Sequence, residues 1–437
     1  MAEAVSERRR TPLYALFAAM GVSMTGNTVS ELAIPWYVLT TTGSPARAGM
    51  VAFMSSLAKI SSAFFGGAVV DKLGFRKAGV GADLASCVAV ASIPLLSTTV
   101  GLPFWVLLGL VFLGAVLDTS GDTARQALVV ELAEDAGMPL GRANSLGDLA
   151  TYAPYLLGPV LGGMLIAWLG VTQALWVDAA SFALSAAILL LVVPSPIRTK
   201  PTIESEPKRG YWASIAEGLT FLHRERTLLW VVGLASVVAL IAGPVPSVLL
   251  PVYVRETLGS ALHLGQIVSA FGFGFAVGIG LYGALAERVP KRVVLAVGIG
   301  AFAALSLVFV TAPSLWVILP ATLLAGVLYG PLEPLTQTVA GERTPEELRG
   351  RVFGTLSAIA GAGAPAGMLI AGFGLEALGV RPFFGVIGAL LCAMAVLVFV
   401  PPALRALDSG ERSMPECTPE SPAVIGRPDA SPGSTPR

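Results

Sequence analysis

Residues 67–77 read Gly67-Ala-Val-Val-Asp71-Lys72-Leu-Gly74-Phe-Arg76-Lys77, a short charged loop between two long apolar segments. The pattern recurs later in the chain as Gly283-Ala-Leu-Ala-Glu287-Arg288-Val-Pro-Lys291-Arg292. Both stretches place a small residue and three apolar residues before an acid, a base, a short turn and two further bases. A second repeat relates residues 126–142 to residues 337–351. The offset in residue number between its two copies is nearly the same as in the first repeat. The sequence therefore predicts one unit of several helices that occurs twice.

The composition places most of this chain in a lipid bilayer. Of its 437 residues, 54% are hydrophobic and only 13% are charged, whereas soluble domains are about 25% charged. The net charge of zero argues against a nucleic-acid partner, which requires a basic excess. The sequence has no phosphate-binding Gly-x-x-x-x-Gly-Lys-Ser/Thr loop, no metal-site or disulfide spacing of its three cysteines, and no catalytic cluster at membrane depth. We therefore expect no enzyme activity, no cofactor and no direct use of ATP.

Twelve apolar segments are long enough to cross the hydrocarbon core, which requires about 20 residues. Basic residues predict the orientation, because cytoplasmic loops carry an excess of Lys and Arg. With the N-terminus inside, all but four of the 28 Lys and Arg residues are cytoplasmic; Arg47, Arg255 and Arg381 fall outside and Lys59 lies within a span. We expect a multi-pass protein of the cell inner membrane or plasma membrane with both termini in the cytoplasm. The predicted spans are 13–39, 48–70, 79–96, 102–121, 146–169, 174–193, 228–252, 264–285, 293–310, 315–338, 353–375 and 382–400.

The expected fold is all-α and integral to the membrane, with twelve transmembrane helices in two pseudo-symmetric six-helix bundles. We predict a first half at residues 1–193, a cytoplasmic linker at 194–227, a second half at 228–400 and a disordered cytoplasmic tail at 401–437. The linker is polar, and an amphipathic surface helix is predicted within it at about residues 211–223. Duplicated halves are typical of secondary transporters, which bind their substrate near the bilayer midplane between the repeats.

The loop at residues 67–77 resembles the signature loop between the second and third helices of the major facilitator superfamily. The resemblance implies a gate in which the acid, here Asp71, pairs with basic groups and a helix terminus at the cytoplasmic face. In that family this contact latches the two halves in the outward-facing state, and Arg125 is a candidate partner. A tight-turn acid with solvated neighbours is the alternative. The residues assigned to the gating motif are Gly67, Asp71, Lys72, Gly74, Arg76, Lys77, Arg125, Glu287 and Arg288.

Four further stretches resemble the branch of that family that contains macrolide-efflux pumps, Tap-type drug pumps and enterobactin-type siderophore exporters. One of them, Gly158-Pro159-x-x-Gly162-Gly163, is similar to the fifth-helix motif of antiporters. Its small residues permit close helix approach and Pro159 bends the helix, so a purely structural bend is an alternative. The motif's usual first glycine is Pro154 here, and the fourth-helix arginine of proton antiporters is not evident, which leaves the proton route open. The other stretches are Ala124-Arg125-Gln126-Ala127-Leu128, Arg142-Ala143-Asn144-Ser145 and residues 343–352.

Two charged residues are predicted near the middle of the bilayer, where an ionised group is costly unless it is paired or hydrated. Glu31 is roughly 14 Å and Lys59 roughly 18 Å from the outer ends of their helices, so neighbouring antiparallel helices would bring them together. The hypothesis is that Glu31, with Asn27 one turn before it, carries the coupling proton or meets a cationic substrate while Lys59 tunes it. A static ion pair between the first two helices is the alternative. The other acids are placed nearer the faces: Asp83, Asp118, Asp122, Asp148 and Glu333 toward the inner face and Asp178 toward the outer face.

Several side chains are candidates for lining a substrate cavity. They comprise aromatic residues that follow Glu31 or lie beside glycines in the eighth span, and acids in the fourth and tenth spans. Packing or lipid-facing aromatic residues and a salt-bridged helix end are the alternatives. Bends are predicted at Gly243-Pro244 and at Pro331. The cavity candidates are Trp36, Tyr37, Asp118, Phe271, Phe275 and Glu333.

These observations predict a secondary active transporter that couples proton entry to the efflux of amphipathic drugs, such as macrolides or tetracyclines, by alternating access. One alternative is a dedicated exporter of a siderophore or another natural product. A non-transporting membrane sensor or scaffold is an alternative of a different class, against which the intact Asp71 loop and the midplane Glu31 argue. The expected partners are a small-molecule substrate, protons and the lipid bilayer, and we expect a monomer. The direction of transport rests on the family resemblance alone.

Overall fold

The computed structural model describes the backbone of residues 2–194, 219–223, 225–285, 288–311, 314–405 and 407–408, and no strand occurs among them. Side chains are described for the same residues except 2–9, 63–72, 285, 347, 357 and 360. Several predicted features therefore lie outside the described residues: Glu287, most of the linker with the start of its surface helix, and the tail beyond residue 408. The surroundings of Gly67 and the side chains of Asp71 and Lys72 lie outside them as well.

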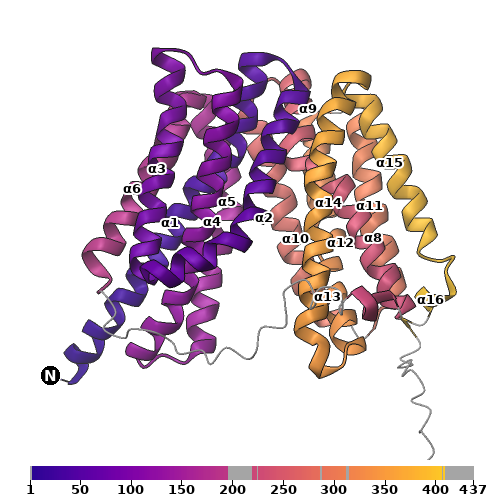
Figure 1. The fold of residues 1–437 in the computed structure, drawn as a ribbon. Helices are drawn as coiled ribbons and strands as arrows, with labels where there is room; N and C mark the ends of the chain where they lie inside the picture. The colour runs from indigo at the N-terminus through magenta and orange to yellow at the C-terminus, as the bar shows by residue number, and fades with distance from the viewer. Residues whose placement is uncertain are drawn as a thin grey trace, which may run out of the picture.

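The first half consists of six long helices that run up and down across the molecule (Figure 1). α1 begins at the face where α16 also lies, here called the terminal face, and ends at the opposite face (Figure 1). The helices of this half are α1 (Ala2–Thr42), α2 (Pro45–Leu73), α3 (Phe75–Thr99), α4 (Phe104–Asp135), α5 (Leu140–Leu169) and α6 (Val171–Val192).

The second half has six further spans, two of which are broken. α8 (Arg226–Ala242) continues through a π-helical turn, η1 (Val245–Leu249), into α9 (Leu250–Thr257), and α12 (Leu315–Tyr329) continues into α13 (Leu332–Arg343). The breaks fall at Gly243-Pro244 and Gly330-Pro331, where proline has no backbone N–H to donate. The bends predicted at these positions are confirmed. The remaining elements are α10 (Ala261–Leu285), α11 (Lys291–Thr311), η2 (Glu346–Leu348), α14 (Arg349–Leu378), α15 (Val380–Leu397) and α16 (Pro402–Arg405).

Ten segments of the described chain are long and apolar enough to cross a membrane. α1 and α2 are not among them, because α1 carries polar residues such as Asn27 and Glu31 and part of α2 lacks described side chains. Both nevertheless pack along the other helices of the first half, α1 against α5 and α6 and α2 against α4. Each half therefore has six spanning helices in the described chain, and the predicted all-α fold is confirmed.

Several helices extend beyond the predicted spans. α4 runs to Asp135 rather than ending near residue 121, and α5 begins at Leu140 rather than near residue 146. Hydropathy falls at the charged residues after Gly121, but residues 122–135 contain no glycine or proline and are rich in good helix formers. The longer α4 places Asp118 near its middle and Arg125 about three turns before its end, which alters the site described below.

The two halves contact each other near the opposite face, where glycines allow backbones to approach closely. A Cβ on Gly49 of α2 would lie 2.6 Å from the Met368 carbonyl oxygen of α14, and a Cβ on Gly265 of α10 would lie 2.1 Å from the Pro159 carbonyl oxygen of α5. Any larger residue at these positions would push the helices apart. Toward the terminal face the two sets of helices diverge (Figure 1). The structure is therefore closed at the opposite face.

Candidate functional site

A cavity of about 700 Å³ lies between the two halves. All charged side chains that line it come from the first half: Glu31, Lys59, Asp118, Asp122 and Asp178. The second half contributes mainly small and apolar residues: Gly243, Pro246, Ser247, Val268, Phe271, Gly272 and Met368. The first half thus supplies all the charge of the cavity together with apolar side chains such as Leu32 and Ile93, whereas the second half supplies an apolar wall. This arrangement suits a ligand with both polar and apolar surface.

Glu31 of α1 and Lys59 of α2 form an ion pair in this cavity, with Lys59 Nζ 3.0 Å from Glu31 Oε1. The structure therefore brings together the two charges that were placed at similar depth from sequence. The side chain of Glu31 is 47% exposed and that of Lys59 is 56% exposed, so water or a ligand in the cavity can reach both. Because an exposed ion pair contributes little to stability, the location of this pair is more informative than its strength.

A second polar contact lies one helical turn away on α1. Asn27 Nδ2 donates a hydrogen bond of 2.8 Å to Asp118 Oδ2 of α4. Asp118 is about 21 Å along α4 from Phe104, so it lies near the middle of the helix and not toward the inner end as predicted. The prediction failed because it took the helix to end where hydropathy falls. Asn27 and Asp118 join α1 to α4 directly beside the Glu31–Lys59 pair.

Arg125 is the centre of a buried ion cluster and is only 1% exposed. Its Nη1 donates to Asp83 of α3, and its Nη2 lies 2.5 Å from Asp122 Oδ1 and 3.5 Å from Asp118 Oδ1. Ser185 of α6 donates a hydrogen bond of 2.7 Å to the other oxygen of Asp83. The cluster therefore joins α3, α4 and α6, and it sets three carboxyl groups against one guanidinium.

This cluster changes two expectations. Arg125 was a candidate partner for Asp71, but both of its terminal nitrogens are engaged by Asp83, Asp122 and Asp118, and the Asp71 side chain lies outside the described residues. Asp83 was expected near the inner face, yet it is buried about 12 Å into α3. α3 begins at Phe75, before the first apolar residues of the predicted span, so the residue is deeper than hydropathy suggests.

Asp178 of α6 is fully buried, and it was expected close to the outer face. Ser30 of α1 donates a hydrogen bond to it, and Ser181 Oγ lies 3.4 Å from its Oδ1. A Cβ on Gly26 would lie 2.4 Å from Asp178 Oδ1, so this glycine allows α1 and α6 to approach. Asp178 therefore lies beside the residue that precedes Glu31, and it belongs to the cavity wall.

The antiporter-type motif of α5 packs against both halves. A Cβ on Gly158 would lie 1.9 Å from Thr28 Oγ1, and one on Gly162 would lie 3.1 Å from Val29 Cα, both on α1. On the other side, a Cβ on Gly163 would lie 2.6 Å from the Ala261 carbonyl oxygen of α10, and Pro159 contacts α10 through Gly265. The motif thus sets the spacing between α1, α5 and the second half.

Within the loop motif, Arg76 contacts the end of α6. Arg76 Nε and Nη2 donate hydrogen bonds of 3.2 and 2.6 Å to the carbonyl oxygens of Leu189 and Leu190, near the C-terminus of α6. A cation at a helix C-terminus is favourable because the unpaired carbonyls carry partial negative charge. Gly74 begins the turn with a φ of 78°, which favours glycine. Lys77 and Arg288 are exposed.

Only two of the six predicted cavity residues line the cavity, namely Asp118 and Phe271. Phe275 instead stacks on Phe271 with ring centroids 6.3 Å apart, in a cluster that includes Phe302 and Tyr329. The other three lie away from the cavity: Trp36 is buried in the core, Tyr37 is half-buried against it, and Glu333 is exposed and accepts a hydrogen bond from Gln337. Trp36 and Tyr37 are turned away from Glu31 by the 100° step between helical residues.

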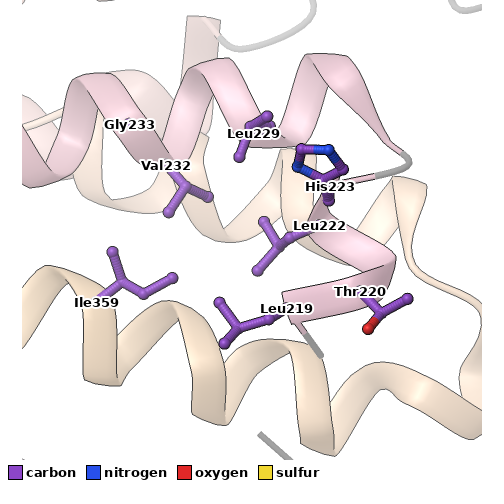
Figure 2. Close-up of a pocket in the computed structure, with 8 residues that line it drawn as sticks. All are labelled: Leu219, Thr220, Leu222, His223, Leu229, Val232, Gly233 and Ile359. Atoms are coloured by element: carbon purple, nitrogen blue, oxygen red, sulfur yellow. The ribbon is translucent and has the colours of Figure 1, made fainter. Parts of the chain in front are cut away.

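A second pocket of about 540 Å³ lies at the start of α8 (Figure 2). Leu222, Leu229, Val232 and Ile359 surround it, and its polar residues, Thr220 and His223, lie toward one end (Figure 2). Among the described residues that line this pocket, none is an acid, a lysine or an arginine. Among the described residues there is also no group of three or more His, Cys, Asp or Glu side chains that could hold a metal ion. The central cavity is therefore the candidate site.

Comparison with known proteins identifies the family. A model of the Major Facilitator Superfamily matches residues 16–262 and 232–428, one match for each half. The chain belongs to the major facilitator superfamily. It is similar to the multidrug efflux pump Tap of Mycobacterium tuberculosis (strain ATCC 25618 / H37Rv), with 32% identity over 402 residues that cover 91% of this chain and 95% of the relative. It is also similar to macrolide efflux protein A of Streptococcus pyogenes, with 20% identity over 406 residues that cover 90% of this chain and 97% of the relative.

Solved structures of other transporters show the same fold. The nucleoside transporter NupG has a TM-score of 0.72 at 11% identity, covering 90% of this chain and 98% of that one. A bacterial homolog of the human lysosomal transporter Spinster, in an inward-facing and unoccupied conformation, has a TM-score of 0.69 at 15% identity, covering 93% of this chain and 99% of that one. These structures confirm the predicted architecture.

Sequence reasoning missed Asp83 and Asp178 as members of the site. Both lie within apolar helices, and a depth estimate from the true helix ends would have found them, about 12 Å from the start of α3 and about 10 Å from the start of α6. The serines that face them, Ser185 and Ser30, carried no signal in the sequence because small hydroxyl residues are common in membrane helices.

Proposed function

We propose that this protein exports amphipathic, drug-like molecules in exchange for protons by alternating access. The observation that carries the proposal is the Glu31–Lys59 ion pair, half-exposed in a cavity whose charged residues all come from the first half and whose other residues are mainly apolar or small. An ionisable pair inside a membrane protein is costly and marks an ion or substrate pathway. The similarity to efflux pumps for multiple drugs and for macrolides supports export over uptake.

The charge distribution supports a terminal face that lies in the cytoplasm of a bacterial inner or plasma membrane. The loops of that face hold most of the basic residues, as the positive-inside rule requires of cytoplasmic loops. Closure at the opposite face then corresponds to an inward-facing state, in which drug enters from the cytoplasm. We infer that a monomer suffices for transport, because the two halves of a single chain face each other across the cavity.

In this scheme the apolar part of the drug packs against Val268, Phe271 and Met368, and its polar or cationic part lies near the carboxylates of the first half. When the cavity faces outward, a proton from the more acidic exterior neutralises Glu31. A neutral acid no longer holds a cation, so the drug leaves and the protonated protein returns inward. Proton release to the cytoplasm restores the Glu31–Lys59 pair and completes the exchange.

The test is the accumulation of a fluorescent cationic dye and of a labelled macrolide in energised cells that express the protein. We expect lower accumulation than in cells with an empty vector, and we expect an uncoupler or Glu31→Gln to reverse it. Asp148→Asn is the matched control, because Asp148 is an exposed acid of α5 outside the cavity and its change should leave export intact.

Equal accumulation in expressing and empty cells for both compounds would contradict broad drug export and would favour a dedicated natural-product substrate. Export that survives Glu31→Gln but not the uncoupler would assign the coupling proton to another acid of the cavity wall. Export that survives the uncoupler would contradict proton coupling itself.

A further inference from the structure

Glu376, close to the end of α14 in the second half, reaches across to the first half at the opposite face. Ser44 Oγ donates a hydrogen bond of 2.7 Å to Glu376 Oε2, and the backbone N–H of Ala46 donates one of 3.2 Å to the same oxygen. Among the hydrogen bonds between described residues, these two are the ones that join the halves. Within the described part of the chain, the polar contact between the halves is thus concentrated on one carboxylate.

The receiving group is the N-terminus of α2. This helix begins at Pro45, and its first turn presents backbone N–H groups that have no partner within the helix. The N-terminus of a helix also carries a partial positive charge, which favours a carboxylate. Ser44 precedes the helix and its Oγ accepts a hydrogen bond of 3.3 Å from the Arg47 N–H, so the serine links Glu376 to the first turn.

A close backbone contact between the same two helices accompanies this cap. A Cβ on Gly372 would lie 3.0 Å from Gly49 Cα and 3.1 Å from the Pro45 carbonyl oxygen. Glu376 lies one turn beyond Gly372 on α14, so both contacts close the same corner of the interface. The corner cannot open at the opposite face without breaking the two hydrogen bonds to Glu376.

We propose that Glu376 is a positioning residue for transport: it latches α14 to the start of α2 and stabilises the state that is closed at the opposite face. The signature loop follows the other end of α2, and its resemblance implies a latch for the reverse state. α2 would then be held at its start in one state and at its end in the other. This proposal rests on the alternating access of the proposed function, but not on the identity of the substrate.

The test measures distances across the opposite face by pulsed electron spin resonance in a background without the native cysteines. Spin labels at Thr99→Cys and Ser314→Cys report on the two halves, since both positions are exposed beside helix ends at that face. We expect Glu376→Ala to raise the ratio of open to closed distances by about three- to tenfold. Glu376→Lys should raise it further, because it places a positive charge at the helix N-terminus, and Glu376→Gln less, because its amide oxygen still accepts hydrogen bonds.

Two controls separate a latch from a general loss of surface charge or stability. Glu256→Ala removes an exposed acid from the last turn of α9, at the same face, without removing a hydrogen bond to any described residue, and should leave the distances unchanged. Ser44→Ala removes one of the two donors and should give a smaller shift than Glu376→Ala. Unchanged distances in both Glu376→Ala and Glu376→Lys, or an equal shift in Glu256→Ala, would overturn the proposal.

The measurement is made on purified protein without drug, so its outcome is independent of drug export. A shifted distribution in a protein that fails to export the dye would leave the latch standing and remove the proposed substrate class. Normal export by the protein, together with unchanged distances in the Glu376 variants, would remove the latch and leave the proposed substrate class standing.

Discussion

Around the central cavity, an ion cluster joins helices of the first half, and an aromatic cluster joins helices of the second. In the first half, Arg125 on α4 holds Asp83 of α3, which in turn accepts a hydrogen bond from Ser185 of α6. In the second half, Phe302 of α11 and Tyr329 of α12 pack against Phe271 of α10, with centroids 5.4 to 5.9 Å apart. Beside the cavity, the helices of the two copies are thus joined by different interactions, ion pairs in the first copy and aromatic contacts in the second.

The repeat makes this contrast specific to single positions. Aligning Gln126 with Gln337 places Asp118 opposite Tyr329 and Asp122 opposite Glu333. Asp118 and Asp122 line the cavity, whereas neither of their counterparts does. Because charge inside a membrane is costly, its confinement to one half indicates where the ion chemistry resides. The second half is left to provide shape and apolar surface.

The largest expected effect comes from breaking the ion cluster. Arg125→Leu leaves Asp83, Asp118 and Asp122 without their cation in a buried site, which should lower the free energy of unfolding by about 3–5 kcal/mol. Thermal unfolding of the purified protein in detergent measures the loss. Phe302→Leu in the aromatic cluster should lower the free energy of unfolding by clearly less. Equal losses in the two variants would show that the ion cluster does not stabilise the protein more than the aromatic cluster does.

A smaller loss is expected where α5 packs on α1. Gly158→Ala places a methyl group where Thr28 Oγ1 lies 1.9 Å away, so the helices must separate and stability should fall by about 1–3 kcal/mol. Gly280→Ala in α10 is the control in the second half, because nothing lies within 4 Å of its Cβ position. The same unfolding assay compares the two. A neutral Gly158→Ala would mean that this contact relaxes without cost.

The functional asymmetry can be tested at two acids. Glu31→Gln should reduce energised dye export by about tenfold or more, with little change in unfolding temperature, because exposed ion pairs contribute little to stability. Glu333→Gln in the second half should change neither, since Glu333 is exposed and lies outside the cavity. Initial rates of efflux from preloaded cells provide the measurement. Equal losses of export rate in the two variants would contradict the placement of the ion chemistry in the first half.

The smallest effect is expected at the counterpart of Asp118. Tyr329→Phe removes a hydroxyl that makes no hydrogen bond to a described residue, so the free energy of unfolding should change by less than about 0.5 kcal/mol. Asp118→Ala removes the acceptor of Asn27 and a neighbour of Arg125, and it should impair both folding and export. Melting curves and efflux rates, measured under the same conditions for Tyr329→Phe and Asp118→Ala, distinguish the two variants. A Tyr329→Phe variant as impaired as Asp118→Ala would contradict the contrast.

The sequence predicted the number of spans and the meeting of Glu31 with Lys59, because both depend on helix length and rise per residue. The duplication was predicted from the two repeated motifs. It misplaced Asp83, Asp118 and Asp178, since hydropathy marks where a chain becomes polar and not where a helix ends. Hydrogen bonds such as Asn27 to Asp118 need the rotation and tilt of two helices, which tertiary packing sets.

Trp36 and Tyr37 show that closeness in sequence does not by itself place residues in the same cavity. Their closeness to Glu31 in sequence suggested a shared cavity, but Trp36 packs into the core and neither residue lines the cavity. The role of the signature loop stays a prediction, because the Asp71 and Lys72 side chains lie outside the described residues.

The apolar wall of the cavity has an evolutionary consequence. Exchanging Val268, Phe271 or Met368 for another apolar residue alters the volume and outline of the cavity without adding or removing a charge. Such substitutions leave the ion cluster and the Glu31–Lys59 pair untouched, so selection can retune the range of accepted compounds by single steps while the energy-converting residues remain fixed. A lineage exposed to a new compound would accumulate changes at such apolar positions of the cavity first.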